Sequence, residues 1–95
     1  MTAYVIADIE VTDPAAYEGY KAAVGATIAA FGGRYLSRAG HTEVLEGGWQ
    51  PKRLVILEFP SLAHAQAWYR SPGYAPLLAL RKSASQSQLV ITEGL

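Results

Sequence analysis

Apolar and polar side chains alternate through the first segment of the chain, Ala3–Val11. Successive side chains of a β-strand point to opposite faces, so the odd-numbered residues here share one face, and all of them are apolar. Tyr4, Ile6 and Asp8 lie on the other face. The pattern predicts a strand whose odd-numbered face packs beneath helices.

A helix is predicted directly after this strand, from Pro14 to about Phe31. Asp13 can accept hydrogen bonds from the free amides of a helix N-terminus, and proline at the first helical position has no N–H to leave unpaired. Gly32 and Gly33 then favour the end of the helix. The large side chains recur at steps of three and four, which places them on one stripe: Tyr17, Tyr20, Val24, Ile28 and Phe31.

The middle of the chain is predicted to be a hairpin with a long, bent arm. Arg34–Ala39 and Thr42–Glu46 have strand character and are separated near Gly40, and residues 47–51 carry the turn signal Gly-Gly-Trp-Gln-Pro. The returning strand, Arg53–Phe59, is the strongest in the chain. Alternation predicts a helix-facing set, Val55, Leu57 and Phe59, and an opposite set, Leu54, Ile56 and Glu58.

Two consecutive helices with a kink between them, and then a last strand, complete the predicted elements. Pro60-Ser61 begins the first of these helices, and Ser71-Pro72 repeats a capping residue followed by proline before the second. Gln88–Glu93 is predicted to be the closing strand.

This order of elements, βαββαβ, is typical of the ferredoxin-like α+β fold, a four-stranded antiparallel sheet with its helices on one face. We expect a single domain over residues 1–95, with strand order four, one, three, two. The sheet face without helices would then carry Tyr4, Ile6, Leu54 and Ile56, which is too apolar to leave in water. A second copy of the sheet is the simplest cover, which predicts a homodimer formed through this face.

Composition excludes several classes of partner. Eight basic and eight acidic residues give a net charge of zero, so we expect neither a nucleic-acid partner nor a membrane partner. The chain has no cysteine, and its N-terminal apolar run is short and interrupted by Asp8, so a cytoplasmic protein without a signal peptide is expected. His41 and His64 lack a third ligand at metal spacing, so no metal site is predicted.

Short motifs distributed along the chain point to a known family. Together with Asp13-Pro14 and Gly33-Arg34-Tyr35-Leu36, they cover nearly the whole sequence: Glu46-Gly47, Trp49-Gln50-Pro51, Arg53-Leu54, Glu58-Phe59-Pro60-Ser61, Ala67-Trp68-Tyr69, Ser71-Pro72, Tyr74 and Arg81. On these motifs the chain resembles the bacterial family known as domain of unknown function 1330. The resemblance implies a dimeric α/β barrel, in which two ferredoxin-like sheets pack face to face. That superfamily includes cofactor-free monooxygenases, haem-degrading enzymes and stress-response binding domains, but the family itself brings no established reaction.

Candidate catalytic residues are Glu58, Arg38 and His41. In the expected strand order, Asp8 and Glu58 share one sheet face, and Arg38 is predicted to reach that face. Carboxylates and an arginine placed together can tune each other's protonation, which favours a site, although an ion-pair network that sets the dimer register would look the same. His41 lies in a predicted loop and is a candidate base.

Candidate ligand-binding residues are Arg53, Arg81, Trp68, Tyr69 and Tyr74. Guanidinium groups bind planar anions through two hydrogen bonds, although each arginine could instead pair within the chain, Arg81 for example with Glu46. The aromatic residues, with Tyr17 and Tyr20, could line an apolar pocket or simply belong to the core. Trp49 is interpreted either as a lid on its own barrel or as part of an arm packed on the partner chain.

These predictions define a homodimer that binds a small, partly apolar molecule with an anionic or carbonyl group. One hypothesis is a cofactor-independent enzyme, an oxygenase or isomerase, in which Glu58 or His41 takes a proton and Arg38 or Arg53 stabilises an oxyanion. A second is a non-catalytic or stress-associated module that uses the same cavity. A third is a purely structural dimer. No cofactor is expected.

Overall fold

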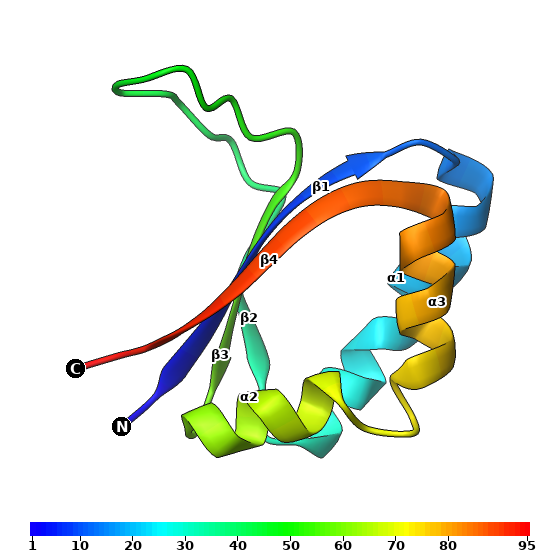
Figure 1. The fold of residues 1–95 in the computed structure, drawn as a ribbon, viewed down its shortest axis with the longest axis vertical. Coiled ribbons are helices and arrows are strands. Elements are labelled where there is room, and N and C mark those ends of the chain that lie inside the picture. Colours follow the sequence, from blue (N-terminus) through cyan, green and yellow to red (C-terminus); the bar gives the residue numbers. More distant parts are fainter.

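The computed structural model describes all residues from Met1 to Leu95. The elements in chain order are β1 (Ala3–Val11), α1 (Pro14–Ala30), β2 (Arg34–Arg38), β3 (Leu54–Phe59), α2 (Leu62–Tyr69), α3 (Ala75–Ala84) and β4 (Ser85–Glu93). The strands form one antiparallel sheet in the order β2-β3-β1-β4, and all three helices cover the same face (Figure 1). The predicted ferredoxin-like fold class and strand order are both confirmed. None of the helices has the length and apolar character needed to cross a bilayer.

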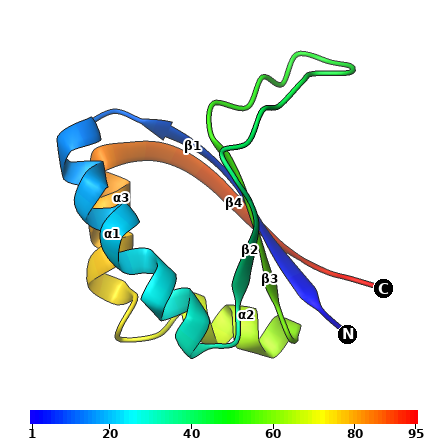
Figure 2. The ribbon, with the colours of Figure 1, turned by 180° about the vertical axis from the view of Figure 1, so that it is seen from behind.

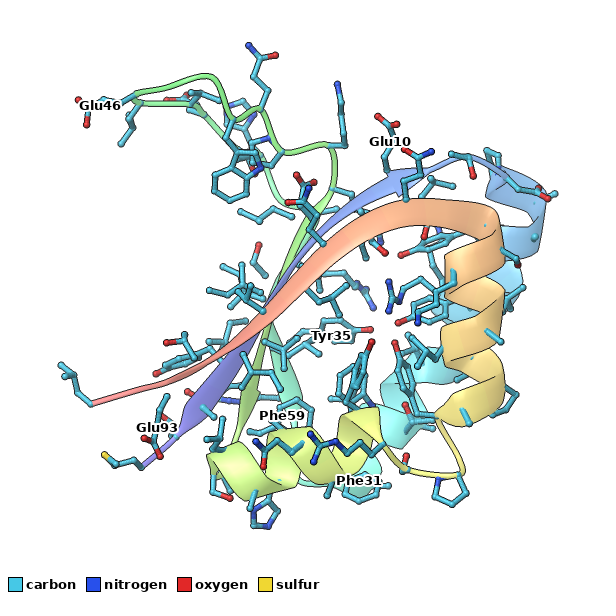
Figure 3. The ribbon with its side chains drawn as sticks, viewed as in Figure 1. Glu10, Phe31, Tyr35, Glu46, Phe59 and Glu93 are labelled. Atoms are coloured by element: carbon cyan, nitrogen blue, oxygen red, sulfur yellow. The ribbon has the colours of Figure 1, made fainter.

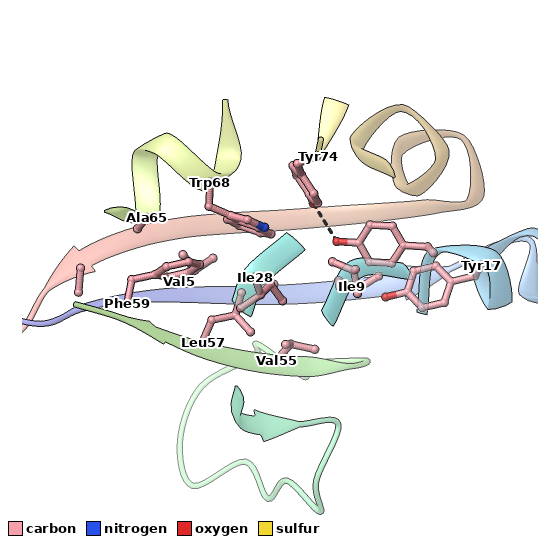
Figure 4. Close-up of a cluster of buried hydrophobic side chains, with 14 of the residues drawn as sticks. Val5, Ile9, Tyr17, Ile28, Val55, Leu57, Phe59, Ala65, Trp68 and Tyr74 are labelled. Atoms are coloured by element: carbon pink, nitrogen blue, oxygen red, sulfur yellow. Dashed lines mark hydrogen bonds between the residues drawn. The ribbon is translucent and has the colours of Figure 1, made fainter. Parts of the chain in front are cut away.

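The core lies between this sheet face and the helices, as the alternation predicted. Val5, Ala7 and Ile9 of β1 are buried, and the same parity on β3 buries Val55, Leu57 and Phe59. Figure 4 shows these strand side chains facing Trp68 of α2 and the stripe of α1. That stripe is buried at Tyr17, Tyr20, Val24 and Ile28. The face of the sheet without helices, here called the open face, carries Ile6 opposite Ile56 and Val90.

Local interactions determine where helix α1 begins and ends. The Asp13 side chain accepts a hydrogen bond from the backbone N–H of Ala16, and Pro14 follows as the first helical residue. Beyond the helix, Gly32 has φ of +77°, a conformation that favours glycine. At Gly33 a Cβ atom would stand 2.5 Å from the Phe59 ring and 2.7 Å from Ile28, so a side chain there has no room.

The prediction that Thr42–Glu46 continues the strand is wrong. Residues 39–53 instead form a long irregular connection, here called the arm, which leaves the sheet on the side away from the helices (Figures 1 and 2). The arm is tied at its base: Asp8 accepts hydrogen bonds from the indole of Trp49 and from the backbone N–H of Lys52, each at 2.9 Å. Its outer part has no neighbouring strand to pair with, so strand propensity alone cannot make it a strand.

Two boundaries also differ from the sequence prediction. Strand β4 starts at Ser85 rather than Gln88, because α3 runs directly into residues that pair with the end of β1. The Ser71 side chain accepts a hydrogen bond from the Tyr74 N–H, as a capping residue does, but regular helix begins only at Ala75. The intervening turn buries Tyr74 completely.

Candidate ligand-binding site

A cavity of about 260 Å³ lies between the sheet and the helices of the same chain. Its walls are mostly apolar, and the charged side chains that reach it are all basic: Arg38, Arg53, Arg81 and Lys21. The remaining lining residues are Val5, Ala7, Ile9, Tyr17, Tyr20, Val24, Ile28, Tyr35, Val55, Leu57, Trp68 and Leu89. No carboxylate and no histidine lines this space.

The cationic end of the cavity is fixed by the strand register around Ile9. The carbonyl of Arg53, just before β3, accepts a hydrogen bond from the Ile9 N–H, so Arg53 enters beside this residue. On the other side of β1, Ile9 is paired with Ser87, and the Arg81 side chain donates a hydrogen bond to the Ser87 hydroxyl. Arg53, from the residue before β3, and Arg81, from α3 through its bond to Ser87 of β4, therefore both reach the level of Ile9 on β1. Arg38 pairs with Val55 and reaches the cavity further along the sheet from Ile9.

The opposite end of the cavity is apolar and aromatic. It is formed where Val5 pairs with Leu57, with Ile28 of α1 and Trp68 of α2 above them. The Trp68 indole is held in place because its N–H donates to Thr27 on α1 at 3.1 Å. The ring centroid of Trp68 also lies 4.4 Å from that of Tyr74. The cavity thus has a polarity that runs along β1, from arginines at Ile9 to hydrocarbon at Val5.

Arg81 belongs to a buried hydrogen-bonded network. It is 2% exposed, yet its Nε donates to the Tyr74 hydroxyl at 3.3 Å and no carboxylate contacts it. The Tyr74 hydroxyl in turn lies 2.8 Å from that of Tyr20, the contact marked in Figure 4. Burial opposes the positive charge, but the hydrogen bond to Tyr74 and the neighbouring phenols leave the pKa of Arg81 raised. Arg81 therefore stays a cation inside the fold.

The phenols beside the arginines stay neutral. Burial, reinforced by Tyr74, raises the pKa of Tyr20 far above its usual range. Burial also raises the pKa of Tyr35, against the opposing charge of Arg38, whose guanidinium lies 5.1 Å from the Tyr35 ring centre. Figure 3 shows Tyr35 pointing from β2 into the space between the sheet and the helices. Neutral hydroxyl groups and permanent cations therefore line the polar end of the cavity.

The guanidinium of Arg53 is incompletely satisfied. Its Nε is buried and has no hydrogen-bond partner, and the group lies 5.7 Å from the centre of the Tyr17 ring. The ion pairs of the chain involve Lys21 with Glu18, Arg34 with Glu58, and His41 with Glu43. None of them includes Arg38, Arg53 or Arg81. Arg81 is buried, Arg53 is half-buried and Arg38 is exposed, and no carboxylate of the chain neutralises the charge of these three arginines at this end of the cavity.

The candidate catalytic residues are not brought together. Glu58 lies on the open face, where it accepts a hydrogen bond from Arg34 at 2.9 Å. The expectation that Arg38 shares this face is wrong, because a bulge at Leu36 shifts the register of β2 and turns Arg38 to the helix side. His41 is exposed on the arm and contacts Glu43 at 3.2 Å.

The structure brings most of the ligand-binding candidates to the cavity. Arg53, Arg81 and Trp68 line the cavity, Tyr74 stands behind it through its bond to Arg81, and Tyr69 packs on the outer side of the aromatic cluster. The suggested pairing of Arg81 with Glu46 is wrong, since Figure 3 shows Glu46 at the far end of the arm.

Trp49 is not a lid on the cavity, because its indole donates a hydrogen bond to Asp8 on its own sheet. That hydrogen bond lowers the pKa of Asp8 and, with the backbone donors, occupies its carboxylate as an anchor for the arm. Packing of the arm on a partner chain stays a prediction. No group of three potential metal-ligating side chains occurs in the structure.

Sequence reasoning missed Tyr35 and Ser87 as parts of the site. Tyr35 has the parity of a helix-facing residue, since it pairs with Leu57, and this signal was present in the alternation of its strand. Ser87 lies in the part of β4 that precedes the predicted strand.

The fold and the cavity define a ferredoxin-like α+β domain with a cation-lined internal site. The chain belongs to the family described as domain of unknown function (DUF1330), whose model matches residues 2–95. No curated protein matches this sequence.

Solved structures show the same fold at low sequence identity. A protein of unknown function from Rhodopseudomonas palustris, RPA0582, superimposes with a TM-score of 0.80 at 20% identity, over 99% of this chain and 82% of that chain. SnoaB, a cofactor-independent oxygenase from Streptomyces nogalater, gives a TM-score of 0.64 at 18% identity, over 99% of this chain and 92% of that one. A dimeric ferredoxin-like protein of unknown function from Thermobifida fusca gives 0.66 at 16% identity, over 99% and 92%.

Proposed function

We propose that this protein binds a small, partly apolar organic anion in the cavity between its sheet and its helices. The observation that carries the proposal is the set of three arginines, Arg38, Arg53 and Arg81, that face an apolar cavity without any carboxylate partner. An anionic ligand would supply the missing counterion and could accept from the unpaired Nε of Arg53. The neutral hydroxyl of Tyr35 and the apolar walls would hold the rest of the molecule.

The test compares Arg53→Gln with Arg34→Gln. Arg53 has an unpaired, buried Nε, whereas Arg34 pairs with Glu58 on the open face. Calorimetric titration with a panel of carboxylates, sulfonates and phosphate esters should find anions that bind the wild type and Arg34→Gln equally and bind Arg53→Gln at least about tenfold more weakly. Without ligand, Arg53→Gln should be as stable as the wild type, because it removes a cation that has no partner. Equal binding by all three proteins would contradict the proposal.

A catalytic role is the second candidate, in the form of a cofactor-independent oxygenase. It is favoured by the fold shared with SnoaB and by the donors Arg53 and Arg81, which could stabilise an oxyanion as it forms. Glu58 and His41 lie away from this space, so the proton would have to leave a substrate that is already acidic. Oxygen uptake with phenolic or enolic substrates, measured with an oxygen electrode, tests this role, and it should fall in Arg81→Gln. The absence of uptake would leave a binding function.

We also propose that two copies associate through the open face. Ile6, Ile56 and Val90 form an apolar row across three strands there, and Val90 is 59% exposed in the single chain. The protein from Thermobifida fusca, similar in fold, is described as dimeric, which supports self-association. Because the cavity lies on the other side of the sheet, association would leave its cationic end accessible.

A further inference from the structure

The volume of the cavity limits its ligand to a small molecule. An engineered apolar cavity of about 150 Å³ is known to hold benzene, so a volume of about 260 Å³ corresponds to roughly ten non-hydrogen atoms. Drug-sized ligands occupy pockets that begin at about 300 Å³. The volume therefore fits one ring with a short substituent.

The polarity of the cavity sets how such a molecule would lie. Arg53 and Arg81 reach the level of Ile9 on β1, whereas the Trp68 end lies at Val5, four residues along the same strand. Four residues of extended chain span about 13 Å, and the arginine side chains take up part of this length. The remaining space runs from cations to hydrocarbon, so an anionic group at one end and an apolar ring at the other would match it.

The chemistry of the anion follows from its partners. Guanidinium groups form paired, parallel hydrogen bonds with carboxylates, and Arg53 has an unpaired N–H that a carboxylate could accept. At the far end, Trp68, Leu57 and Ile28 line the cavity with apolar atoms, against which a ring can pack.

We infer that the ligand is a single-ring carboxylic acid, bound as its carboxylate at Arg53 and Arg81 with its ring against Trp68. The inference rests on the proposed anion-binding function and narrows it to one chemical class and one orientation. Tyr20 and Tyr74 act as positioning residues, because their hydroxyl pair holds Arg81 at the carboxylate end.

The experiment is a calorimetric comparison of four probes with the wild type: 3-phenylpropionate, its neutral isostere 3-phenylpropanamide, propionate without the ring, and 2-naphthoate with a fused ring. The expected order places 3-phenylpropionate at least tenfold tighter than each of the other three. Arg53→Gln should remove the preference for the acid over the amide, and Arg34→Gln should retain it.

Nuclear Overhauser contacts locate the ring independently of any variant. Ring protons of 3-phenylpropionate should contact the methyl groups of Leu57 and Ile28. Contacts to Arg53 and Tyr17 instead would overturn the orientation. Equal affinity for the amide or for propionate, or tighter binding of 2-naphthoate, would overturn the class while leaving anion binding intact. Failure of every carboxylate, with a sulfonate or phosphate ester still bound, would overturn the class alone, and failure of every anion would overturn both the class and the proposed function.

Discussion

The hydroxyl groups of Tyr20 and Tyr74, which are 54 residues apart in the chain, lie 2.8 Å from each other in the buried interior. Tyr20 comes from α1 and Tyr74 from the turn before α3, so their hydrogen bond joins the two helical segments that roof the cavity. Arg81 donates to the same Tyr74 hydroxyl from α3. A single oxygen atom therefore links the helix packing to the cation at the cavity wall.

Replacing Tyr20 with phenylalanine should destabilise the protein modestly at neutral pH. The change removes one hydrogen bond and leaves Tyr74 with Arg81, so the loss in unfolding free energy should be about 1 kcal/mol. Urea denaturation followed by circular dichroism measures it. A loss within error of zero would show that the contact does not hold the helices together.

The same variant should change the pH dependence of stability. The pKa of Tyr20 is raised in the folded state, so its stabilising contribution is complete below the unfolded value near 10 and is lost as the pH rises beyond it. The unfolding free energy of the wild type should thus fall above about pH 10, and that of Tyr20→Phe should fall less steeply. A slope in Tyr20→Phe equal to that of the wild type would contradict this.

The elements were predictable because two short-range signals agree along most of the chain. Alternation in Ala3–Val11 and in Leu54–Phe59 assigned the core face correctly, and Asp13-Pro14 located the start of α1. The outer arm was not predictable in the same way. Residues such as Val44 and Leu45 suit a strand, but a strand also needs a neighbour to supply hydrogen bonds, and local sequence does not report one.

The candidate site was only partly predictable, since one extra residue changes which face a side chain occupies. Without the bulge at Leu36, Arg38 would lie on the open face with Glu58, as the alternation suggested. Arg53 and Arg81 both reach the level of Ile9 because of the register in which β1 pairs with its two neighbours. This register is a long-range property of the chain. Residue types therefore favoured an anion site, which stays a prediction, while the positions of the arginines required the register.

Replacing Gly33 with alanine should destabilise the fold. The new Cβ would stand 2.5 Å from the Phe59 ring and 2.7 Å from Ile28, and the Phe59 ring is fully buried in the core. Overpacking of this kind costs about 1–3 kcal/mol, which thermal or urea denaturation can measure. Gly25→Ala is the matched control, because nothing lies within 4 Å of its Cβ position in the middle of α1. It should stabilise the protein by about 0.5–1 kcal/mol, and a loss of stability similar to that of Gly33→Ala would refute the steric argument.

Asp8 should control how firmly the arm is held. In Asp8→Ala the Trp49 indole and the Lys52 amide both lose their acceptor, so the Trp49 fluorescence should shift to the red and the Lys52 amide should exchange faster with solvent. The exposed Glu43→Ala, elsewhere on the arm, should leave both signals unchanged.

The attachment of the arm should also depend on pH in a defined direction. The hydrogen bond from Trp49 lowers the pKa of Asp8 below its usual value of 3.8, so its contribution is present above that pH and is lost as the pH falls through the lower folded value. The indole N–H resonance of Trp49 should hold its position down to about pH 4 and move only below it. A transition centred above pH 4 would contradict this.

Replacing Ile56 with glutamate should separate the proposed dimer without unfolding the chain. Ile56 lies at the centre of the open face, opposite Ile6, and is only half-buried in the single chain, so a carboxylate there can reach water in a monomer. Between two sheets, the same carboxylate would be buried without a partner, at a cost of several kcal/mol. Sedimentation should therefore show a dimer for the wild type and a monomer with native circular dichroism for Ile56→Glu, while Ala63→Glu on the exposed side of α2 remains dimeric. A wild type that sediments as a monomer at micromolar concentration would refute association through the open face.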